Sequence, residues 1–372
     1  MSLSAVIVDR TGQPLTHAAY DTVKPSELWP PIIIRSAEID QLIDKLASHP
    51  RPANGRREAI IVHPNAVDAG QGLAPGTQVV LSVLKPGERT SPVRQNSTQV
   101  QFCILGTGTA AIGSRIVRFQ QYDVCNIPSF VPYCHENDST KGLQARLTYS
   151  NAPLLEMLRV HLVDDQAKMP VGELASKTVE EMDPQRRSPF GSFELTPDGA
   201  WLMPYELLID PPTVNSPTLH WPWVEVKANL DKLSALGKEY IGRRLYLLYN
   251  PMTSRSNGTT PSFFATITIR PPKIIDRPHR HVSSAINYYF HGRGYSVVDG
   301  DRYEWSAGDL MLSAPGWAIH NHASYDDPVY ELTIQDQPLH IMMESLLWQE
   351  NLKEPPAVLG TNMGFVTNRG PS

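Results

Sequence analysis

The strongest constraint on the fold is that the second half of the chain repeats the first. The segment FCILGTG at 102–108 matches YYFHGRG at 288–294, and an aspartate, a proline and a histidine then follow in the same order in both halves. The aligned pairs are Asp123 with Asp309, Pro128 with Pro315, and His135 with His322. Several markers agree to within one residue, which predicts a duplicated module rather than chance similarity.

Each copy of the module has the pattern of β-strands. Short β-branched runs such as AIIVHP, TQVVLSVLKPGE and FFATITIRPP are separated by Gly, Pro and Asn. The 33 prolines in 372 residues also favour short strands over long helices. The G-x-G pairs lie between two strand-like runs, which indicates hairpin glycines rather than a phosphate loop. We therefore predict an all-β fold.

Two segments are expected to form bracing helices. SAEIDQLIDKLASH has Ser36 as its expected N-cap and acidic residues in its first turn, and WPWVEVKANLDKLSALG has the pattern of a second helix. A polar, proline-rich segment separates the two β-rich halves. We predict an N-terminal domain at 1–165, a linker at 166–222 and a C-terminal domain at 223–372.

Composition narrows the class of function. The net charge is -5 and there is no block of Lys and Arg, which argues against binding to nucleic acid or to a membrane surface. No apolar run reaches the length of a membrane span and no signal-peptide pattern opens the chain, so we expect a cytoplasmic protein. The three cysteines form no C-x-x-C pair, and no G-x-S-x-G, P-loop or H-E-x-x-H motif occurs.

Histidines concentrate in the second module. In a strand, residues i and i+2 point to one face, so the H-x-H spacing places His279 and His281 side by side. A second H-x-H, His320 and His322, lies on another strand-like run. This pattern favours a metal site; the alternative is a set of buried histidines hydrogen-bonded to backbone. We interpret His291 as a solvent-facing hairpin residue.

These motifs resemble a known family. PHRHVSSAINYYFHGRG and AGDLMLSAPGWAIHNH are similar to the two metal motifs of the cupin superfamily, and more closely to those of the gentisate 1,2-dioxygenases, bicupins with salicylate-type relatives. The segments LWPPIIIRS, REAIIVHPN and WPWVEV extend the resemblance over most of the chain. It implies two double-stranded β-helix (jelly-roll) barrels with a few bracing helices, in a homo-oligomer, either a tetramer or a dimer.

The resemblance assigns the metal ligands. His279, His281 and His320 would hold Fe(II), and His322 would exchange protons with the substrate. The general cupin motif has a glutamate where this chain has Ala285, which agrees with the all-histidine site of the gentisate-type enzymes. Three neutral imidazoles would leave the ion its full charge and open positions. The implied activity is oxygen-dependent ring cleavage of an aromatic hydroxy acid, with dioxygen as the second substrate.

The first module departs from the family pattern. Val93, Gln95 and Tyr133 occupy the positions equivalent to the three ligands. We therefore expect the N-terminal cupin to be free of metal. His135 aligns with His322, and we interpret it as a structural residue.

The substrate pocket departs as well. Asn287 replaces a family arginine that would bind the substrate carboxylate, and Thr268 and Phe264 replace a glutamine and a tryptophan. We expect these three residues to shape the pocket. Either Arg270 or Arg277 supplies the missing cation, or the substrate is a different phenolic chelator; both arginines could equally face solvent.

Two other functions stay open at this point. The same scaffold supports an oxygen-independent isomerase, lyase or decarboxylase that uses Mn, Ni or Zn as a Lewis acid. It also supports a non-catalytic, small-molecule-binding bicupin. Anaerobic turnover would favour the former, and non-stoichiometric metal in purified protein the latter.

Overall fold

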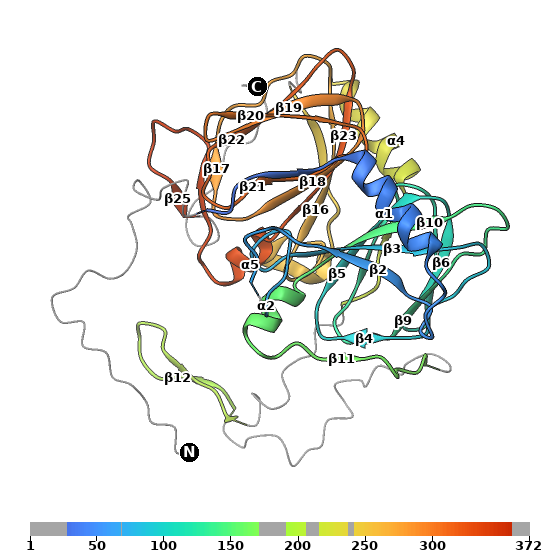
Figure 1. The fold of residues 1–372 in the computed structure, drawn as a ribbon. Coiled ribbons are helices and arrows are strands. Elements are labelled where there is room, and N and C mark those ends of the chain that lie inside the picture. Colours follow the sequence, from blue (N-terminus) through green and yellow to red (C-terminus); the bar gives the residue numbers. More distant parts are fainter. Residues whose placement is uncertain (1–27, 68, 171–190, 206–215, 237–241, 359–372) are drawn as a thin grey trace, which may run out of the picture.

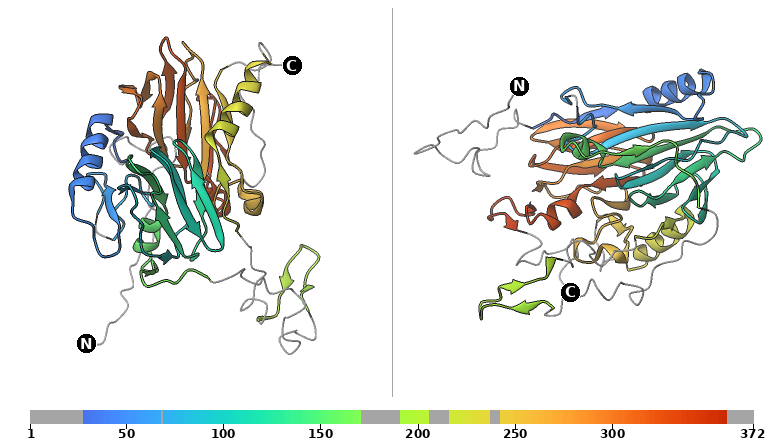
Figure 2. Two further views of the ribbon diagram at one scale, coloured as in Figure 1. Left: turned by 90° about the vertical axis from the view of Figure 1, so that its right-hand side faces the viewer. Right: turned by 90° about the horizontal axis from the view of Figure 1, so that it is seen from below.

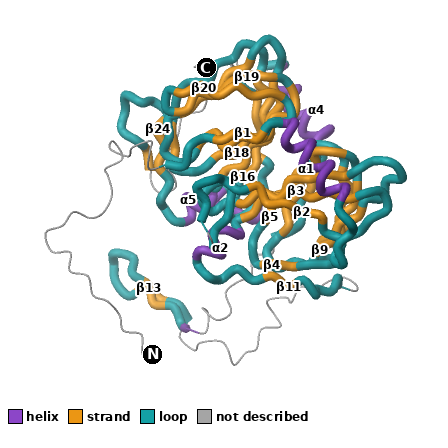
Figure 3. Tube along the Cα trace, viewed as in Figure 1, coloured by secondary structure: helices purple, strands orange, loops and turns teal. Residues whose placement is uncertain are grey.

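The structure is a computed structural model that describes residues 28–67, 69–170, 191–205, 216–236 and 242–358. Parts of the predicted linker, 171–190 and 206–215, lie outside the described residues. Strands dominate the described chain (Figure 3). The helices are α1 (Ser36–Ser48), α2 (Ala152–Met157), α4 (Trp223–Ser234), α5 (Gln337–Met342) and the 3-10 helix η5 (Pro251–Ser256).

The duplication predicted from the sequence is visible in the sheets. The strands of the first half are β2 (Arg57–Ile61), β3 (Gln78–Leu84), β4 (Arg94–Gln95), β5 (Gln99–Leu105), β6 (Gly108–Ile112), β7 (Arg115–Phe119), β8 (Val124–Ile127), β9 (Tyr133–Glu136), β10 (Gln144–Ser150) and β11 (Val163–Asp164). Those of the second half are β15 (Arg244–Leu247), β16 (Phe264–Arg270), β17 (Arg280–His281), β18 (Ala285–His291), β19 (Arg293–Val298), β20 (Asp301–Ser306), β21 (Leu310–Ala314), β22 (His320–Ser324), β23 (Val329–Gln335), β24 (Leu347–Gln349) and β25 (Ala357–Val358).

Each half forms a six-stranded sheet and a three-stranded sheet with the same internal order. The first half gives β14-β8-β5-β10-β3-β2 and β7-β6-β9, and the second gives β1-β21-β18-β23-β16-β15 and β20-β19-β22. Small pairs β11-β4 and β12-β13 and the triplet β17-β24-β25 complete the set. The remaining strands are β1 (Ile32–Ile34), β12 (Phe193–Glu194), β13 (Trp201–Leu202) and β14 (His220–Trp221). The all-β prediction is confirmed.

The two halves exchange edge strands. β1 precedes the first half but pairs with β21 of the second, with Ile32 opposite Leu312. β14 precedes the second half but pairs with β8 of the first, with His220 opposite Cys125. Each six-stranded sheet is thus completed by a segment that leads into the other half, which interlocks the two modules (Figure 1).

The repeated aspartates hold the two bracing helices. Asp309 Oδ1 accepts a hydrogen bond from the Ser36 N–H at 2.8 Å, at the start of α1, and Asp123 Oδ1 accepts one from the Trp223 N–H at 2.8 Å, at the start of α4. Carboxylates at helix N-termini satisfy free N–H groups and complement the helix dipole. The helices lie on opposite outer sides of the sheets (Figure 2).

The prediction that Ser36 is the N-cap of α1 is wrong by one residue. Arg35 occupies the cap position, and its N–H donates to the carboxylate of Glu38 at 2.8 Å. The Ser36 N–H is satisfied by Asp309 instead. The sequence pattern could not reveal this, because the capping carboxylate comes from the other half of the chain.

The glycines between β5 and β6 and between β18 and β19 have a steric cause. Gly106 and Gly292 have φ values of +76° and +77°, and a Cβ atom would lie 2.2 Å from the Leu143 carbonyl oxygen in one case and 2.3 Å from that of Pro328 in the other. Only glycine fits such a turn without strain. The hairpin interpretation is wrong, because the strands on either side of each glycine lie in different sheets: β5 and β18 belong to the six-stranded sheets, and β6 and β19 to the three-stranded ones.

One hydrophobic core joins the modules. Phe102 of the first half lies 5.7 Å from both Tyr288 and Phe290 of the second, measured between ring centroids, and Tyr122 lies 4.7 Å from Phe290. Such aromatic contacts add to the stabilisation from buried apolar area. The three cysteines are buried and unpaired. None of the described helices has the length and apolar character needed to cross a membrane.

Candidate metal centre

Three buried histidines of the second half lie close together. His279 and His320 face each other across an antiparallel bridge, with N–H to carbonyl distances of 3.1 and 2.9 Å, and His281 lies on β17. The ring centroids of His320 are 4.5 Å from His279 and 4.8 Å from His281. One potential ligand atom of each histidine lies within 4.8 Å of the others.

Backbone carbonyls fix the tautomer of all three rings. The Nδ1 atoms of His279, His281 and His320 lie 3.0, 2.8 and 2.9 Å from the carbonyl oxygens of Arg277, Ser283 and Ala318. A carbonyl only accepts, so each Nδ1 carries the proton and donates it. The Nε2 lone pairs are then free, which is the state in which neutral imidazole binds a metal.

Burial keeps these imidazoles neutral. The pKa of His281 is lowered to about 3, first by burial and then by the nearby His279 ring. Burial also lowers the pKa of His279 and holds that of His320 well below its usual range. At neutral pH the three rings therefore present lone pairs without first having to lose protons.

Carboxylates do not join the cluster among the described residues. Ala285 occupies the cupin glutamate position and lines the pocket beside the histidines. Glu331 also lines it, but both of its oxygens accept hydrogen bonds from the Arg270 guanidinium at 3.1 Å. The donor set is therefore all nitrogen.

His322 lies next to the cluster with its ring held differently. Its Nδ1 is 2.7 Å from the Ser296 hydroxyl oxygen, which also accepts a hydrogen bond from the Trp305 indole N–H at 2.9 Å. A hydroxyl oxygen has two lone pairs and one proton, so these contacts are compatible with a proton on either nitrogen of the His322 ring. Burial holds its pKa well below the usual value. His322 is thus a neutral imidazole that lines the pocket.

The histidine pocket, defined here by its ten lining residues, contains only some of the predicted site residues. The lining consists of Arg243, His279, Ala285, Asn287, His320, His322, Glu331, Thr333, Gln335 and Trp348. The Asn287 amide donates to the Thr333 hydroxyl at 2.9 Å. Asn287 is thereby held by neighbouring strands with its side chain at the pocket.

Five other predicted residues fall outside this lining, and one of them is His281, although it belongs to the histidine cluster. Thr268 is buried on β16 opposite Glu331, and Phe264 is half-buried at the start of that strand. Arg270 is fully buried, and its guanidinium binds Asp276 as well as Glu331. Arg277 has an exposed side chain and contributes only its carbonyl, to His279. Neither arginine lines the pocket.

Arg243 and Trp348 are lining residues that sequence reasoning missed. Arg243 lies 3.4 Å from the Asp276 carboxylate, and its Nε has no hydrogen-bond partner among the described residues. The Trp348 ring stacks on His279 at 5.5 Å between centroids. The repeat offered one signal for Arg243, which aligns with Arg56 directly before β2.

Comparisons with known proteins agree with this architecture. No family model matches the chain. A 5-aminosalicylate 1,2-dioxygenase of Comamonas sp is 34% identical over 127 residues, 33% of each chain, and a 1-hydroxy-2-naphthoate 1,2-dioxygenase of Nocardioides sp. (strain KP7) is 26% identical over 311 residues, 82% of this chain and 73% of that one. A gentisate 1,2-dioxygenase of Streptomyces sp is 32% identical over 32% of this chain. The matches with the first and last of these span about a third of those relatives' lengths.

Solved structures decide the fold. The salicylate 1,2-dioxygenase of Pseudaminobacter salicylatoxidans superposes with a TM-score of 0.69 at 16% identity, over 86% of this chain and 88% of that one. A variant of that enzyme in complex with gentisate gives 0.69 at 18% identity, over 86% and 85%. This chain has the bicupin fold. Its curated relatives are gentisate- and salicylate-type 1,2-dioxygenases.

The N-terminal cupin of this bicupin carries a valine and two polar residues, Val93, Gln95 and Tyr133, where the C-terminal one carries histidines. The Gln95 amide donates to the Tyr133 hydroxyl at 3.1 Å. His135 Nε2 lies 2.7 Å from Gln101 Oε1, so it donates to that amide oxygen. The hydrogen bonds satisfy these groups within the module; that this cupin is free of metal stays a prediction.

His135 should make stability depend on pH. Burial holds its pKa well below the usual value of about 6.5. Below about pH 6.5 the unfolded chain therefore binds a proton that the folded chain does not, and the free energy of unfolding falls as pH falls, by up to about 1.4 kcal/mol per pH unit for this group. Urea denaturation of the metal-free protein should show a shallower pH dependence for His135→Gln. An unchanged slope would contradict the assignment.

Proposed function

We propose that this bicupin is an Fe(II)-dependent ring-cleaving dioxygenase that acts on a gentisate- or salicylate-like aromatic hydroxy acid. The observation that carries the proposal is the group of three buried imidazoles whose Nδ1–H groups donate to backbone carbonyls. The names of the curated relatives support the reaction class. We assign His279, His281 and His320 as the ligands.

Iron suits this donor set. Three neutral nitrogen donors on one side of an ion resemble the facial arrangement of non-haem iron oxygenases with its carboxylate replaced. When bound, Fe(II) would supply redox chemistry toward dioxygen and positions for an anionic chelating substrate. Without a carboxylate ligand the site keeps more positive charge, which favours binding of a hydroxy acid through two oxygens.

Arg243 is our candidate for the group that binds the substrate carboxylate. It is the one cation in the described lining of the histidine pocket, where Asn287 replaces the arginine expected from the resemblance. Its contact with Asp276 is long at 3.4 Å, and its Nε has no described partner. A guanidinium in this state can still form charge-assisted hydrogen bonds with a carboxylate.

His322 and Asn287 would position the rest of the substrate. When the Ser296 hydroxyl donates to Nδ1, the proton of the His322 ring is on Nε2, where it can donate to an anionic oxygen. A hydrogen bond from this N–H would stabilise an oxygen on which negative charge develops. The Asn287 amide is fixed by Thr333, so its contact with a ring substituent would be directional.

The pocket must widen when an aromatic substrate binds. Its volume is about 40 Å³, well below the cavity of about 150 Å³ that accepts benzene in a protein core. Arg243 and Trp348 are half-buried members of the lining, whereas the histidines are buried. We infer that these two side chains move aside to admit the ring.

The proposal is tested by oxygen uptake. Protein reconstituted with Fe(II) should consume dioxygen with at least one of gentisate, salicylate, 5-aminosalicylate and 1-hydroxy-2-naphthoate. Turnover of such a substrate without oxygen would favour the isomerase, lyase or decarboxylase alternative. Iron-replete protein that consumes no oxygen with any of them would refute the proposed substrate class.

Arg243→Gln should weaken substrate use while leaving iron in place. Loss of a hydrogen bond to a charged group costs about 1.5–3 kcal/mol, so we expect kcat/KM to fall about 10- to 100-fold, mainly through KM. Steady-state oxygen uptake and iron content should be measured together. Arg293→Gln, an exposed position outside the lining, is the matched control and should behave as wild type. Equal kinetics for the two variants would exclude Arg243 as the anchor.

The finer predictions belong to this proposal. We propose Fe(II) as the resident ion, a homo-oligomer (tetramer or dimer) as the assembly, and the cytoplasm as the location. Metal analysis and light scattering test the first two directly. The domain boundaries at 1–165, 166–222 and 223–372 likewise stay predictions.

A further inference from the structure

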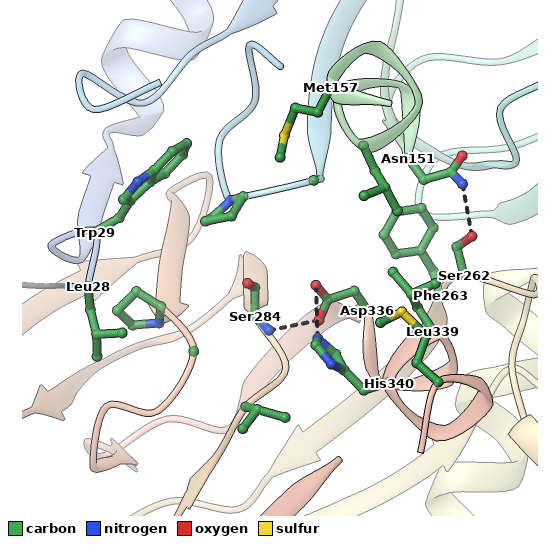
Figure 4. A pocket seen from close by; sticks show the side chains of 17 residues that line it. Leu28, Trp29, Asn151, Met157, Ser262, Phe263, Ser284, Asp336, Leu339 and His340 are labelled. Atoms are coloured by element: carbon green, nitrogen blue, oxygen red, sulfur yellow. Dashed lines mark hydrogen bonds and ion pairs between the residues drawn. The ribbon is translucent and has the colours of Figure 1, made fainter. Parts of the chain in front are cut away.

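A second cavity lies on the seam between the two cupin modules. Its volume is about 380 Å³, and α2 and α5 with the segment before β1 form its walls (Figure 4). Its described lining shares no residue with the histidine pocket. We propose that this seam cavity binds a small ligand with an apolar, aromatic-sized body and a cationic amino group, which the Asp336 carboxylate holds.

The seam cavity sits between two repeated elements. NAPLLEM at 151–157 and DQPLHIM at 336–342 correspond in the two halves, and each starts with a polar cap residue before a short helix. The Thr98 N–H donates to Asn151 Oδ1 at 2.9 Å, and the Ser284 N–H donates to Asp336 Oδ1 at 2.8 Å. These contacts are the same in both modules.

The second polar side-chain atom of each cap residue has a different partner in the two modules. The Asn151 amide donates to the Ser262 hydroxyl at 3.0 Å, which satisfies it. Gly76 lies two residues before β3, as Ser262 lies two residues before β16, so Asp336 lacks the equivalent hydroxyl partner. A protonated His340 would form an ion pair with Asp336 Oδ2 across 3.7 Å (Figure 4), but this distance is beyond the usual N–H···O hydrogen-bond range of about 2.7–3.2 Å. Asp336 Oδ2 therefore keeps capacity to accept at the cavity.

Charge and wall chemistry define the ligand class. No lysine or arginine occurs in the described lining, so Asp336 brings negative charge to a cavity walled by Trp29, Phe263, Leu339 and Met343. A carboxylate shielded from water is stabilised by a paired cation. The volume lies within the range of small-molecule sites and exceeds that of a benzene-sized cavity. An arylalkylamine, whose ammonium group is charged at neutral pH, satisfies both requirements.

The test compares two ligands of similar size and opposite charge. Phenethylamine and phenylpropionate should be titrated into the full-length, iron-loaded protein by calorimetry, with ligand-observed NMR as a second measurement. We expect saturable binding of the amine and none of the acid at this site. Asp336→Asn should weaken amine binding at least about tenfold, the value of one hydrogen bond to a charged group. Asparagine keeps the Oδ1 acceptor for Ser284, as Asn151 does for Thr98, so the fold should persist.

Two further variants separate this site from the histidine pocket. Leu339→Trp adds bulk to the cavity wall and should abolish amine binding, whereas His281→Ala should leave it unchanged. Failure of the dioxygenase proposal would not affect either result. Equal amine affinity in Asp336→Asn, no saturable binding to the wild type, or loss of binding in His281→Ala would overturn the inference.

Discussion

Replacing His281 with alanine is expected to abolish stoichiometric iron binding and oxygen uptake together. His281 is one of three Nε2 donors in the cluster, and its ring is fixed by the Ser283 carbonyl at 2.8 Å. Loss of an outer-shell partner alone typically costs about 10- to 100-fold in metal affinity or activity. Removal of a ligand should lower metal affinity by more than this, because only two imidazoles remain to bind the ion. Metal analysis and an oxygen electrode measure the two effects on the same sample.

His291→Ala is the matched control. His291 also lies on a strand of the second half, at the end of β18, but its side chain is exposed and its Nδ1 contacts the Pro328 carbonyl at 2.9 Å. It should keep full iron content and activity. Stoichiometric iron in the purified His281→Ala protein would show that the ligands are assigned wrongly.

Replacing Arg270 with methionine should destabilise the C-terminal cupin by about 3–5 kcal/mol, the usual cost of breaking a buried ion pair from one side. Burial alone would lower the pKa of Arg270, but the Glu331 and Asp276 carboxylates outweigh it and raise that pKa. The same guanidinium, with Arg243, lowers the pKa of Asp276 to about 2 against the effect of burial. Without Arg270, the buried Glu331 loses its two charge-assisted hydrogen bonds.

Urea denaturation followed by tryptophan fluorescence measures this effect. Arg302→Met removes an exposed arginine that pairs with Glu304 and should leave the denaturation midpoint unchanged, because exposed ion pairs contribute little. An Arg270→Met midpoint equal to that of the wild type would show that Arg270 does not stabilise the folded pocket wall.

The repeat made much of the architecture predictable. The paired glycines, aspartates and histidines recur at one spacing, and the structure gives them equivalent places: Gly106 and Gly292 at bends between two sheets, Asp123 and Asp309 at helix N-termini. The H-x-H spacing brought His279 and His281 together because alternate strand residues share a face. Residue type and spacing within short segments of the chain were enough to predict these features.

The exchange of edge strands between the two modules could not be predicted from the sequence. β1 and β14 lie in the sheets of the opposite modules, and short apolar runs carry no signal for their partner strand. Arg270 and Arg277 are near the histidines in sequence, yet Arg243 lines the pocket, because β15 pairs with β16 at the edge of the same sheet. Trp348 reaches the histidines through the pairing of β24 with β17.

The most direct test of the central account is isotopic. Iron-loaded protein should be supplied with labelled dioxygen and whichever aromatic hydroxy acid supports oxygen uptake, and the ring-opened product analysed by mass spectrometry. The account predicts that both atoms of dioxygen enter the product and that His281→Ala yields none. A product that forms under nitrogen, or that contains no label, would contradict it.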